Sequence, residues 1–369
     1  MNIFEEYLNK ITKLVLKNKI FLELENLNDF KGINVETPPL EFNYDLSCNI
    51  CLVLGKINKK KPKELAEKLK VLILKNYKDF NKIEIAGPGF LNLNLSNKTL
   101  ITIMNQILEK KHIFGKKTSS NKYNIEFVSA NPTGPMHVGH CRGAIYGDVL
   151  ANLLLFNGNE VDKEYYINDY GNQIINFTKS VFLRIREIKY FEKFNNTGDL
   201  YPGDYIISIA KNIIKDNSKK KFENFEESYK ILSKESLKHS MNLIKSDLKK
   251  LNIKHDKFTS ETAIVDKNLV QDAVELLKKN NFVEDGFLEP PKGEVIKNWT
   301  RTKRLIFKST KFGDDSDRAL KKDNGSWTYF ANDIAYHMDK VQRKYDYLIN
   351  VLGADHTGYI KRITAAVSA

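Results

Sequence analysis

Two histidines three positions apart, His137 and His140, have the type and spacing best suited to chemistry on a phosphate. They stand in EFVSANPTGPMHVGH (126–140), where a β-rich run leads through a Gly/Pro loop into an apolar-periodic helix. Their spacing puts both imidazoles on one face at the beginning of that helix. Free backbone N–H groups and the positive end of the helix dipole make the same place an anion site. We expect the rings to hydrogen-bond phosphate oxygens while an α-phosphate is attacked.

Metal binding is the alternative role for this pair, and the other polar clusters also have simpler interpretations. No third ligand lies at a recognisable spacing from the histidines, so no metal ligand is predicted. Gly139, between them, lets a flat ring approach the backbone closely. Cys48 and Cys51 lack a second pair and fall in an apolar helical run, so we predict core thiols. The carboxylates of FGDDSDR (312–318) look like a metal loop, and magnesium binding there stays an open alternative at this point.

Elements that alternate between strand and helix must position the histidines. A strand is expected at 123–128, a helix through Leu155 and a second strand at 161–167, followed by a second helix. The same alternation resumes with a helix at 332–344 and a strand at 347–352. This pattern predicts a parallel α/β sheet.

The chain is expected to form two domains, 1–117 and 118–369, with the boundary in a polar stretch near 115–120. The first is predicted to be a small α+β domain, with an N-terminal amphipathic helix and two short strands joined at Gly87-Pro88-Gly89. Within the second, the lysine-rich segment 190–290 is predicted to be a mostly helical insertion without a strong strand signal.

Composition limits the class of protein. The 369 residues are 41% hydrophobic and 11% aromatic, enough to build sizeable cores. The net charge of +13 suits a nucleic-acid partner, but lysines spread over the whole chain equally indicate a general compositional bias. No apolar run approaches the ~20 residues that span a bilayer. The acidic start does not look like a signal peptide, and three cysteines cannot form a disulfide framework, so a reducing cytoplasm is expected.

The motif His-Val-Gly-His resembles the His-Ile-Gly-His signature of class I aminoacyl-tRNA synthetases, and the surrounding EFVSANPTGPMHVGHCRGAIYGD resembles the arginyl-tRNA synthetases in particular. Stretches similar to the same family are DLSCNICLVLGK (45–56), AGPGFLNLNL (86–95), YYINDYGNQI (165–174), FGDDSDRALKKDNGSWTYFANDIAYHMDK (312–340) and GADHTGYIKR (353–362). The resemblance is weakest over 190–290. It implies a Rossmann-type class I catalytic domain with a helical insertion, preceded by a small α+β domain that recognises the tRNA elbow.

The resemblance also implies a role for each matching residue. His137 and His140 would be catalytic. The residues implied to bind arginine are Glu126, Ser129, Asn131, Tyr329 and Asp333. Those implied to touch ATP or the adenylate are Gly139, Gly353, Asp355 and His356. A carboxylate can accept a guanidinium in two parallel hydrogen bonds, so Asp333 is the expected determinant of specificity. Without the resemblance, Asp333 would be interpreted as an acidic residue stabilised at a helix N-terminus.

The implied activity is that of an arginine–tRNA ligase. It would use ATP with Mg²⁺ to activate L-arginine as arginyl-adenylate and would transfer arginine to tRNA(Arg), a reaction whose first step usually needs bound tRNA in this family. A cytoplasmic monomer is expected, without membrane contact or a bound structural metal. The alternatives are a non-catalytic tRNA-binding fragment and a small-molecule nucleotidyltransferase, which shares the paired-histidine site.

The sequence departs from the family pattern in two ways. The lysine-containing signature Lys-Met-Ser-Lys-Ser is not found, and SKES (233–236) is a superficial match inside the predicted insertion. The chain also ends at Ala369 inside an expected helix, with no counterpart of the anticodon-binding domain. We therefore expect a chain that is incomplete at its C-terminus and charges tRNA poorly by itself.

Overall fold

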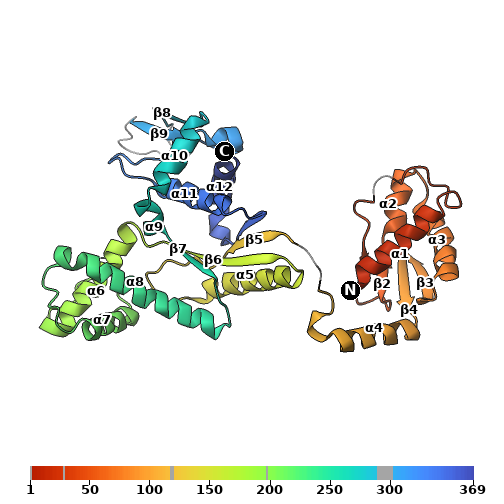
Figure 1. Cartoon of the computed structure of the whole chain (residues 1–369), viewed down its shortest axis with the longest axis horizontal. Helices are drawn as coiled ribbons and strands as arrows, with labels where there is room; N and C mark the ends of the chain where they lie inside the picture. The colour runs from red at the N-terminus through yellow and green to blue at the C-terminus, as the bar shows by residue number, and fades with distance from the viewer. Residues whose placement is uncertain (1, 28–29, 117–119, 197, 289–301) are drawn as a thin grey trace. The chain divides into compact units, whose positions relative to one another are not determined.

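The chain folds into two compact units, Met1–Thr118 and Ser119–Ala369 (Figure 1). A computed structural model of the whole chain gives this structure. It describes residues 2–27, 30–116, 120–196, 198–288 and 302–369, apart from the side chain of Asp355. Each unit buries apolar clusters of its own, which is the property that defines a domain.

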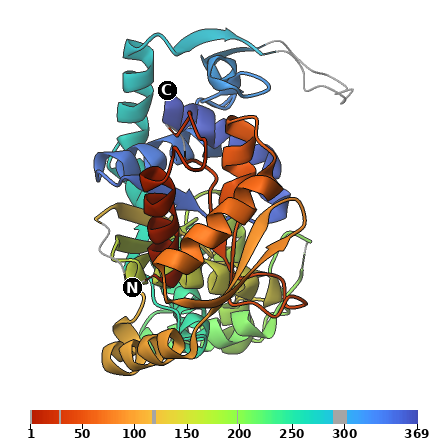
Figure 2. The same ribbon diagram turned by 90° about the vertical axis from the view of Figure 1, so that its right-hand side faces the viewer.

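The first unit, red to orange in Figure 2, combines helices with one antiparallel sheet of order β1-β2-β4-β3. Its elements are α1 (Ile3–Lys17), β1 (Val35–Glu36), β2 (Leu46–Cys48), α2 (Ile50–Ile57), α3 (Pro62–Asn76), β3 (Phe80–Ala86), β4 (Phe90–Leu95), α4 (Asn97–Lys110) and the 3₁₀ turn η1 (Lys111–Ile113). The predicted N-terminal helix and the predicted strand pair are both present.

Local sequence explains the main elements of this unit. Helix α1 buries Tyr7, Ile11, Leu14 and Val15, the apolar stripe expected from its spacing. The β3–β4 turn contains Gly87 and Gly89, both with positive φ. A Cβ on Gly89 would lie 2.9 Å from Cβ of Pro62, so a side chain there would collide with the beginning of α3.

The helical prediction for the run that contains Cys48 and Cys51 is wrong in its first part. Cys48 ends β2, and only Cys51 lies in α2. Three residues of the run pair with β4 and two of them also pair with β1, so this part of the run is an inner strand of the sheet. Both thiols are free and fully buried. Burial raises the pKa of Cys48 to about 12 and that of Cys51 further still, so both are inert core groups.

The second unit is built on a parallel sheet of order β11-β5-β6-β7 (Figure 1). Its strands are β5 (Lys122–Glu126), β6 (Glu160–Ile167), β7 (Lys257–Ser260) and β11 (Tyr347–Asn350). Helix α5 (Val138–Phe156) connects β5 to β6 and approaches the sheet at Gly147, where a Cβ would lie 2.3 Å from Cγ of Phe127. The parallel α/β sheet predicted from the alternation is confirmed.

The order of the strands determines where a ligand would bind. The chain runs from β5 outward to β6 and β7, and then returns to place β11 on the other side of β5. Ligands of open α/β sheets bind beyond the carboxyl ends of the strands at such a reversal. Here those ends are Glu126 of β5 and Asn350 of β11, which are partners in the register.

The segment between β6 and β7 is helical, as predicted for much of 190–290. Its helices are α6 (Asn172–Tyr190), α7 (Asp204–Asp216) and α8 (Phe225–Lys250). Two strands lie in this range although the sequence has no strong strand signal there: β7 joins the parallel sheet, and β8 (Val283–Phe287) joins a separate antiparallel sheet. Strand β7 has only four residues, all half-buried, so it lacks the apolar run that marks a buried strand.

The connection from β7 to β11 carries the rest of this unit. Its elements are α9 (Glu261–Asp266), α10 (Leu269–Lys279), β8, β9 (Lys303–Phe307), the 3₁₀ turn η2 (Ser309–Phe312), β10 (Arg318–Ala319) and α11 (Tyr329–Gln342). After β11 come the 3₁₀ turn η3 (Ala354–His356) and α12 (Thr357–Ser368). Among the helices that the structure describes, none is both long and apolar enough to cross a membrane.

Candidate active site

The paired histidines cap the first turn of α5. Nδ1 of His137, the N-cap residue, accepts a hydrogen bond from the Gly139 backbone N–H at 3.1 Å. Nδ1 of His140 accepts one from the His137 backbone N–H at 3.3 Å. The two rings stack, with centroids 3.7 Å apart. Because each Nδ1 is an acceptor, each neutral ring carries its proton on Nε2, and the pair presents two N–H donors.

Gly139 gives the stacked rings their room. A Cβ at this position would lie 3.0 Å from Cε1 of His137 and would push against that ring. Burial, together with the neighbouring His137, lowers the pKa of His140 below its ordinary value. A neutral ring that donates from Nε2 at a helix N-terminus can stabilise charge on an anionic ligand without being charged itself.

The loop that leads to the histidines begins with a strained turn. Val128 and Ser129 have φ of +69° and +39°, a region that β-branched residues such as valine rarely enter. Two contacts hold the turn. Oγ of Ser129 donates to Oε1 of Glu126 at 3.0 Å and accepts the Tyr166 backbone N–H at 3.1 Å. Asn131, farther along the loop, is exposed.

A buried lysine neutralises the carboxylate at the end of β5. Nζ of Lys340, fully buried on α11, lies 2.5 Å from Oε2 of Glu126 and 2.9 Å from Oδ1 of Asn350. Burial by itself would raise the pKa of Glu126, but the charge and hydrogen bond of Lys340 hold the pKa below its ordinary value. Lys340 therefore joins the carboxyl ends of β5 and β11 at the reversal of strand order.

The same lysine begins a chain of hydrogen bonds that ends at the backbone of Asp333. Nδ2 of Asn350 donates to Nε2 of His337 at 2.9 Å. Nδ1 of His337 must then carry the ring proton, and it donates to the Asp333 carbonyl at 2.8 Å. Nζ of Lys340 can only donate, so the oxygen of the Asn350 amide faces it and the amide nitrogen faces His337. Each group in this series of hydrogen bonds therefore orients the next.

Asp333 is held by a tyrosine from α12. The Tyr359 hydroxyl donates to Oδ2 of Asp333. Burial raises the pKa of Asp333 to about 7, and the charges of Glu261 and Glu126 raise it as well. The hydrogen bond from Tyr359 acts in the opposite direction and lowers the pKa. A carboxyl group in this state binds a cation strongly, because a positive ligand replaces the missing solvation of the carboxylate.

A second carboxyl with a raised pKa, this one buried, lies near half-buried Asp333. Glu261, 2% exposed, is the first residue of α9 and directly follows β7. Its Oε1 accepts a hydrogen bond from Nδ2 of Asn332 at 2.7 Å. Burial raises the pKa of Glu261 to about 7, and the charge of Asp169 contributes to the same shift. Perturbed carboxyls that cluster in this way are typical of functional sites.

The Tyr166 hydroxyl lies among these carboxylates without a partner. Its ring, 9% exposed, stacks on Tyr336 with centroids 4.4 Å apart. Within the described part of the chain, its oxygen is buried and makes no hydrogen bond. Burial is the main cause that raises the pKa of the Tyr166 hydroxyl, and the charges of Glu261 and Asp333 raise it further. Leaving a buried hydroxyl unpaired costs about 1–3 kcal/mol, so a ligand group at this place would be stabilising.

Tyr329 stands at the beginning of α11, 47% exposed. A Cβ on Gly171 would lie 2.7 Å from its hydroxyl oxygen, and Gly171 has a φ of +91°. Nζ of Lys322 lies 5.0 Å from the ring centroid. The tyrosine thus covers the glycine turn before α6.

The residues expected to touch the nucleotide follow β11. Gly353 caps η3, and the His356 backbone N–H donates to its carbonyl at 3.0 Å. The side chain of Asp355 lies outside the described atoms, so its predicted role stays a prediction. Both glycine and histidine are exposed, beyond the carboxyl end of a strand that borders the reversal of strand order.

The carboxylates of 312–318 are already paired. Asp314 accepts two hydrogen bonds from the Arg318 guanidinium, each at 2.8 Å, and Asp315 also pairs with Arg318. Asp317 accepts from the Thr310 hydroxyl at 2.8 Å. Burial by itself would raise the pKa of Asp314, but the hydrogen bonds and charge of Arg318 hold that pKa below its ordinary value. These pairs leave the loop poorly suited to bind a magnesium ion.

Sequence reasoning missed Tyr166, Glu261 and Lys340. Lys340 follows Asp333 by seven residues, two turns of α11, so their shared helix face was a usable signal. Glu261 could have been found only with β7, because its position at the carboxyl end of that strand is what brings it to the site.

Comparison with known proteins gives two family matches along the chain. Residues 3–95 match the family described as arginyl tRNA synthetase N terminal domain. Residues 102–369 match the family described as tRNA synthetases class I (R), catalytic domain. Both matches belong to one kind of protein, and they do not favour a small-molecule nucleotidyltransferase.

Curated relatives are similar over the whole of this chain. An arginine–tRNA ligase of Pelagibacter ubique is 52% identical over 372 residues, and one from the Wolbachia of Brugia malayi is 43% identical. These alignments cover 100% of this chain, which spans 64% of the length of each relative.

Solved structures agree with the fold. An arginyl-tRNA synthetase structure from Campylobacter jejuni superposes with a TM-score of 0.65 at 34% identity, over 74% of this chain and 57% of that one. The Thermus thermophilus arginyl-tRNA synthetase gives a TM-score of 0.57 at 19% identity, over 91% of this chain and 53% of that one, which supports the fold alone. The resemblance seen in the motifs is confirmed, and the chain belongs to the arginyl-tRNA synthetase family of class I tRNA synthetases.

Proposed function

We propose that this chain carries the arginine-activating part of an arginine–tRNA ligase. In the first step the carboxylate of L-arginine attacks the α-phosphorus of ATP, and the bond to the β-phosphate oxygen breaks to release pyrophosphate. Arginyl-adenylate then transfers its arginyl group to tRNA(Arg). The observation that carries the proposal is a pair of carboxyls with raised pKa values, half-buried Asp333 and buried Glu261, beside a tyrosine hydroxyl that has no partner among the described residues.

Arginine is the amino acid whose side chain fits this pair. A guanidinium is always charged and offers five N–H donors in a fixed plane, so it can meet two carboxylates and a hydroxyl together. Asp333, already oriented by Tyr359, would bind one edge of that plane. Glu261 and the Tyr166 hydroxyl would receive the remaining donors. Tyr329, exposed at the beginning of α11, would cover the side chain.

The amino-acid end of arginine would lie at the loop after β5. Glu126 and Ser129 are linked by a hydrogen bond and lie at the strand end next to Lys340. In our proposal, Glu126, Ser129 and Asn131 position the α-amino group and carboxylate of the substrate. Holding the attacking oxygen and the phosphorus in one geometry supplies much of the rate in such reactions.

The phosphate would be bound at the N-terminus of α5. The Nε2–H groups of His137 and His140 would donate to phosphate oxygens as negative charge develops on them during attack. Gly139 keeps these rings in place. Gly353, Asp355 and His356 would contact the adenosine part of ATP or of the adenylate. No covalent bond to the protein is needed in this scheme.

Magnesium would enter with ATP, because its preferred ligands include phosphate oxygens and water. The chain supplies no evident carboxylate cage for the ion among the described residues of 312–318, where Arg318 and Thr310 already bind the carboxylates. When bound, the ion would neutralise charge on the pyrophosphate leaving group.

The first unit would contact the elbow of the tRNA. Its match to the arginyl tRNA synthetase N terminal domain and the net charge of +13 of the chain support this role. We propose a monomer that works in the cytoplasm, where tRNA is charged and where three free cysteines stay reduced.

Calorimetric titration of the 369-residue chain with L-arginine tests the pocket directly. L-citrulline has nearly the same shape but a neutral side chain, and L-lysine has the charge without the planar donors. We expect arginine to bind and both analogues to bind far more weakly. Equal affinity for citrulline and arginine would show that the carboxyl pair does not bind the charged side chain of the substrate. Arginine-dependent ATP–pyrophosphate exchange, measured with tRNA present, tests the chemical step separately.

A further inference from the structure

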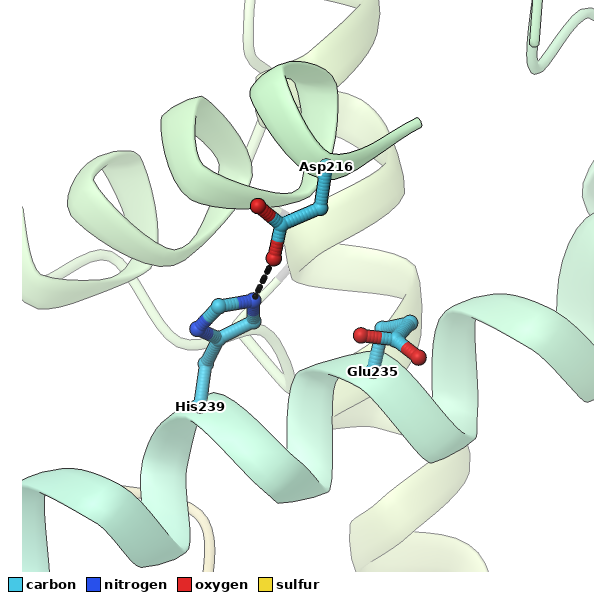
Figure 3. A group of neighbouring side chains, drawn as sticks. All are labelled: Asp216, Glu235 and His239. Carbon is cyan, nitrogen blue, oxygen red and sulfur yellow. Dashed lines mark ion pairs between the residues drawn. The ribbon is translucent and has the colours of Figure 1, made fainter. Parts of the chain in front are cut away.

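Three side chains from two helices converge in the segment between β6 and β7, on elements separate from the candidate active site. Asp216 is the last residue of α7, and Glu235 and His239 lie one turn apart on α8 (Figure 3). One ligand atom from each residue lies within 4.8 Å of the other two. In the described parts of the chain, this is the one such group of histidine, cysteine or acidic side chains.

His239 and Asp216 form an ion pair without a well-aligned hydrogen bond, at a separation that two ligands of one metal ion would also have. Nε2 of His239 lies 3.3 Å from Oδ2 of Asp216. The same nitrogen is buried, but its alignment is poor and it makes no hydrogen bond with any described residue. Nitrogen and oxygen ligands about 2.0–2.2 Å from a tetrahedral zinc ion lie about 3.4 Å apart, close to the observed separation.

Glu235 offers a third donor group from the same face of α8 as His239. Residues four apart on a helix are neighbours, so their ligand atoms can meet one ion without a change of backbone. Oε2 of Glu235 accepts a hydrogen bond from Lys238 at 3.0 Å. That lysine is 55% exposed, and such surface pairs contribute little, so it is a weak competitor for the carboxylate.

We propose that Asp216, Glu235 and His239 form a zinc site that joins α7 to α8. One imidazole and two carboxylates belong to the ligand types that Zn²⁺ takes, and a water molecule would complete a tetrahedral set of four. The ion would replace an imperfectly aligned ion pair with three bonds between two helices. It would stabilise the helical segment and take no part in the activation of arginine, so this inference is independent of the proposed function.

The test uses the full chain, dialysed against a chelator and titrated with ZnCl₂ alone in a calorimeter. We expect one ion per chain at this site and a higher melting temperature with zinc, because a ligand that binds only the folded state stabilises it. His239→Ala and Glu235→Gln should each weaken zinc binding by about tenfold or more. Even the loss of a residue that only hydrogen-bonds to a metal ligand costs about that much, and the loss of a ligand should cost at least as much. Co²⁺ in place of Zn²⁺ should give the visible absorption of a tetrahedral site.

Matched controls separate this site from others. Glu227→Gln makes the same substitution on the same helix outside the cluster and should leave zinc affinity unchanged. His140→Ala should also leave it unchanged, which distinguishes the cluster from the histidine pair on α5. If His239→Ala does not fold by circular dichroism, Asp216→Asn and Glu235→Gln decide the question. The proposal is overturned if the wild type takes up no zinc, or if the cluster variants bind zinc as the wild type does. His239 and Asp216 would then form an ordinary ion pair.

Discussion

Nζ of Lys340 lies 2.5 Å from Oε2 of Glu126, a residue 214 positions earlier in the chain. This ion pair joins α11 to the end of β5, at the place where the order of the parallel strands reverses. Both charges are largely removed from water: the lysine side chain is fully buried and the glutamate side chain is 12% exposed. The pair therefore links the stability of the second unit to the loop that leads to the paired histidines.

Removing only the lysine should be strongly destabilising. Lys340→Met leaves Glu126 buried without its counterion, and the expected loss of unfolding free energy is about 3–5 kcal/mol. The double variant Glu126→Gln with Lys340→Met should recover part of this loss, since no buried charge remains. Urea denaturation measures both. Lys250→Met, at an exposed pair with Asp247, is the control and should stay within ~0.5 kcal/mol of wild type. A loss for Lys340→Met no larger than the control's would contradict the assignment.

Asp333→Asn should weaken arginine binding by about 1.5–3 kcal/mol, the usual contribution of a hydrogen bond to a charged group. The substitution keeps the size of the side chain but removes the charge that would face the guanidinium. Calorimetry with L-arginine measures the effect. Asp339→Asn, on the same helix but paired with Arg343, is the control and should bind arginine as the wild type does. Equal affinity in the Asp333 variant would place the side-chain pocket elsewhere.

Arginine affinity should rise with pH through about 7. Burial raises the pKa of both Asp333 and Glu261 to about 7, so in acid these groups carry protons that a guanidinium must displace. Binding at pH 6.5 should release protons, which makes the measured heat depend on the ionisation enthalpy of the buffer. The dependence should weaken in Asp333→Asn. Affinity that stays constant from pH 6 to 8 would be the contrary result.

The same two groups should make the ligand-free chain less stable as pH rises. Their folded pKa values lie above those of unfolded Asp and Glu, near 3.9 and 4.3. The folded state therefore binds more protons between about pH 4 and 7, and the stability they contribute is complete below that window and lost as pH rises through about 7. Thermal unfolding across this range, with Asp333→Asn as a reference of smaller slope, measures the effect. If Asp333→Asn does not reduce the slope of stability against pH, that slope comes from other groups.

Tyr166→Phe should separate binding from stability. The hydroxyl has no hydrogen-bond partner among the residues that the structure describes, so its removal should leave the unfolding free energy unchanged or slightly higher, while arginine affinity falls. Tyr165→Phe is the matched contrast, because the Tyr165 hydroxyl donates to the Ala130 carbonyl at 2.7 Å. That variant should lose about 1–3 kcal/mol of stability, since it leaves a buried carbonyl unpaired. Unchanged arginine affinity in Tyr166→Phe would show that the hydroxyl faces no substrate group.

The histidine pair should act on rate and not on arginine binding. His140→Ala and His137→Asn should each slow arginine-dependent pyrophosphate exchange by about 10²–10³, because each removes one donor to the phosphate. Asparagine at 137 retains an N-cap acceptor, so the stability of α5 should be kept. His112→Ala, in the first unit, is the control. Exchange at the wild-type rate in both variants would exclude the pair from the chemistry.

The sequence by itself determined the features that depend on neighbours along the chain. The apolar stripe of α1, the glycine turn between β3 and β4 and the strand–loop–helix around His137 and His140 all follow from local spacing, because helices and tight turns are set by residues a few positions apart. The paired-histidine motif indicated class I, and the residues around it, with the other matching stretches, identified the family.

Only the tertiary structure decided which distant residues meet. Strand β7 is too short and too exposed to be recognised alone, and it exists because β6 offers it a parallel edge. Glu261 reaches the site only through β7, and Lys340 meets Glu126 only after β11 has been placed beside β5. The raised pKa of Asp333 depends on burial by segments far apart in sequence, as does the unpartnered Tyr166 hydroxyl. Charge and burial are properties of the packed molecule, so no local pattern could have supplied them.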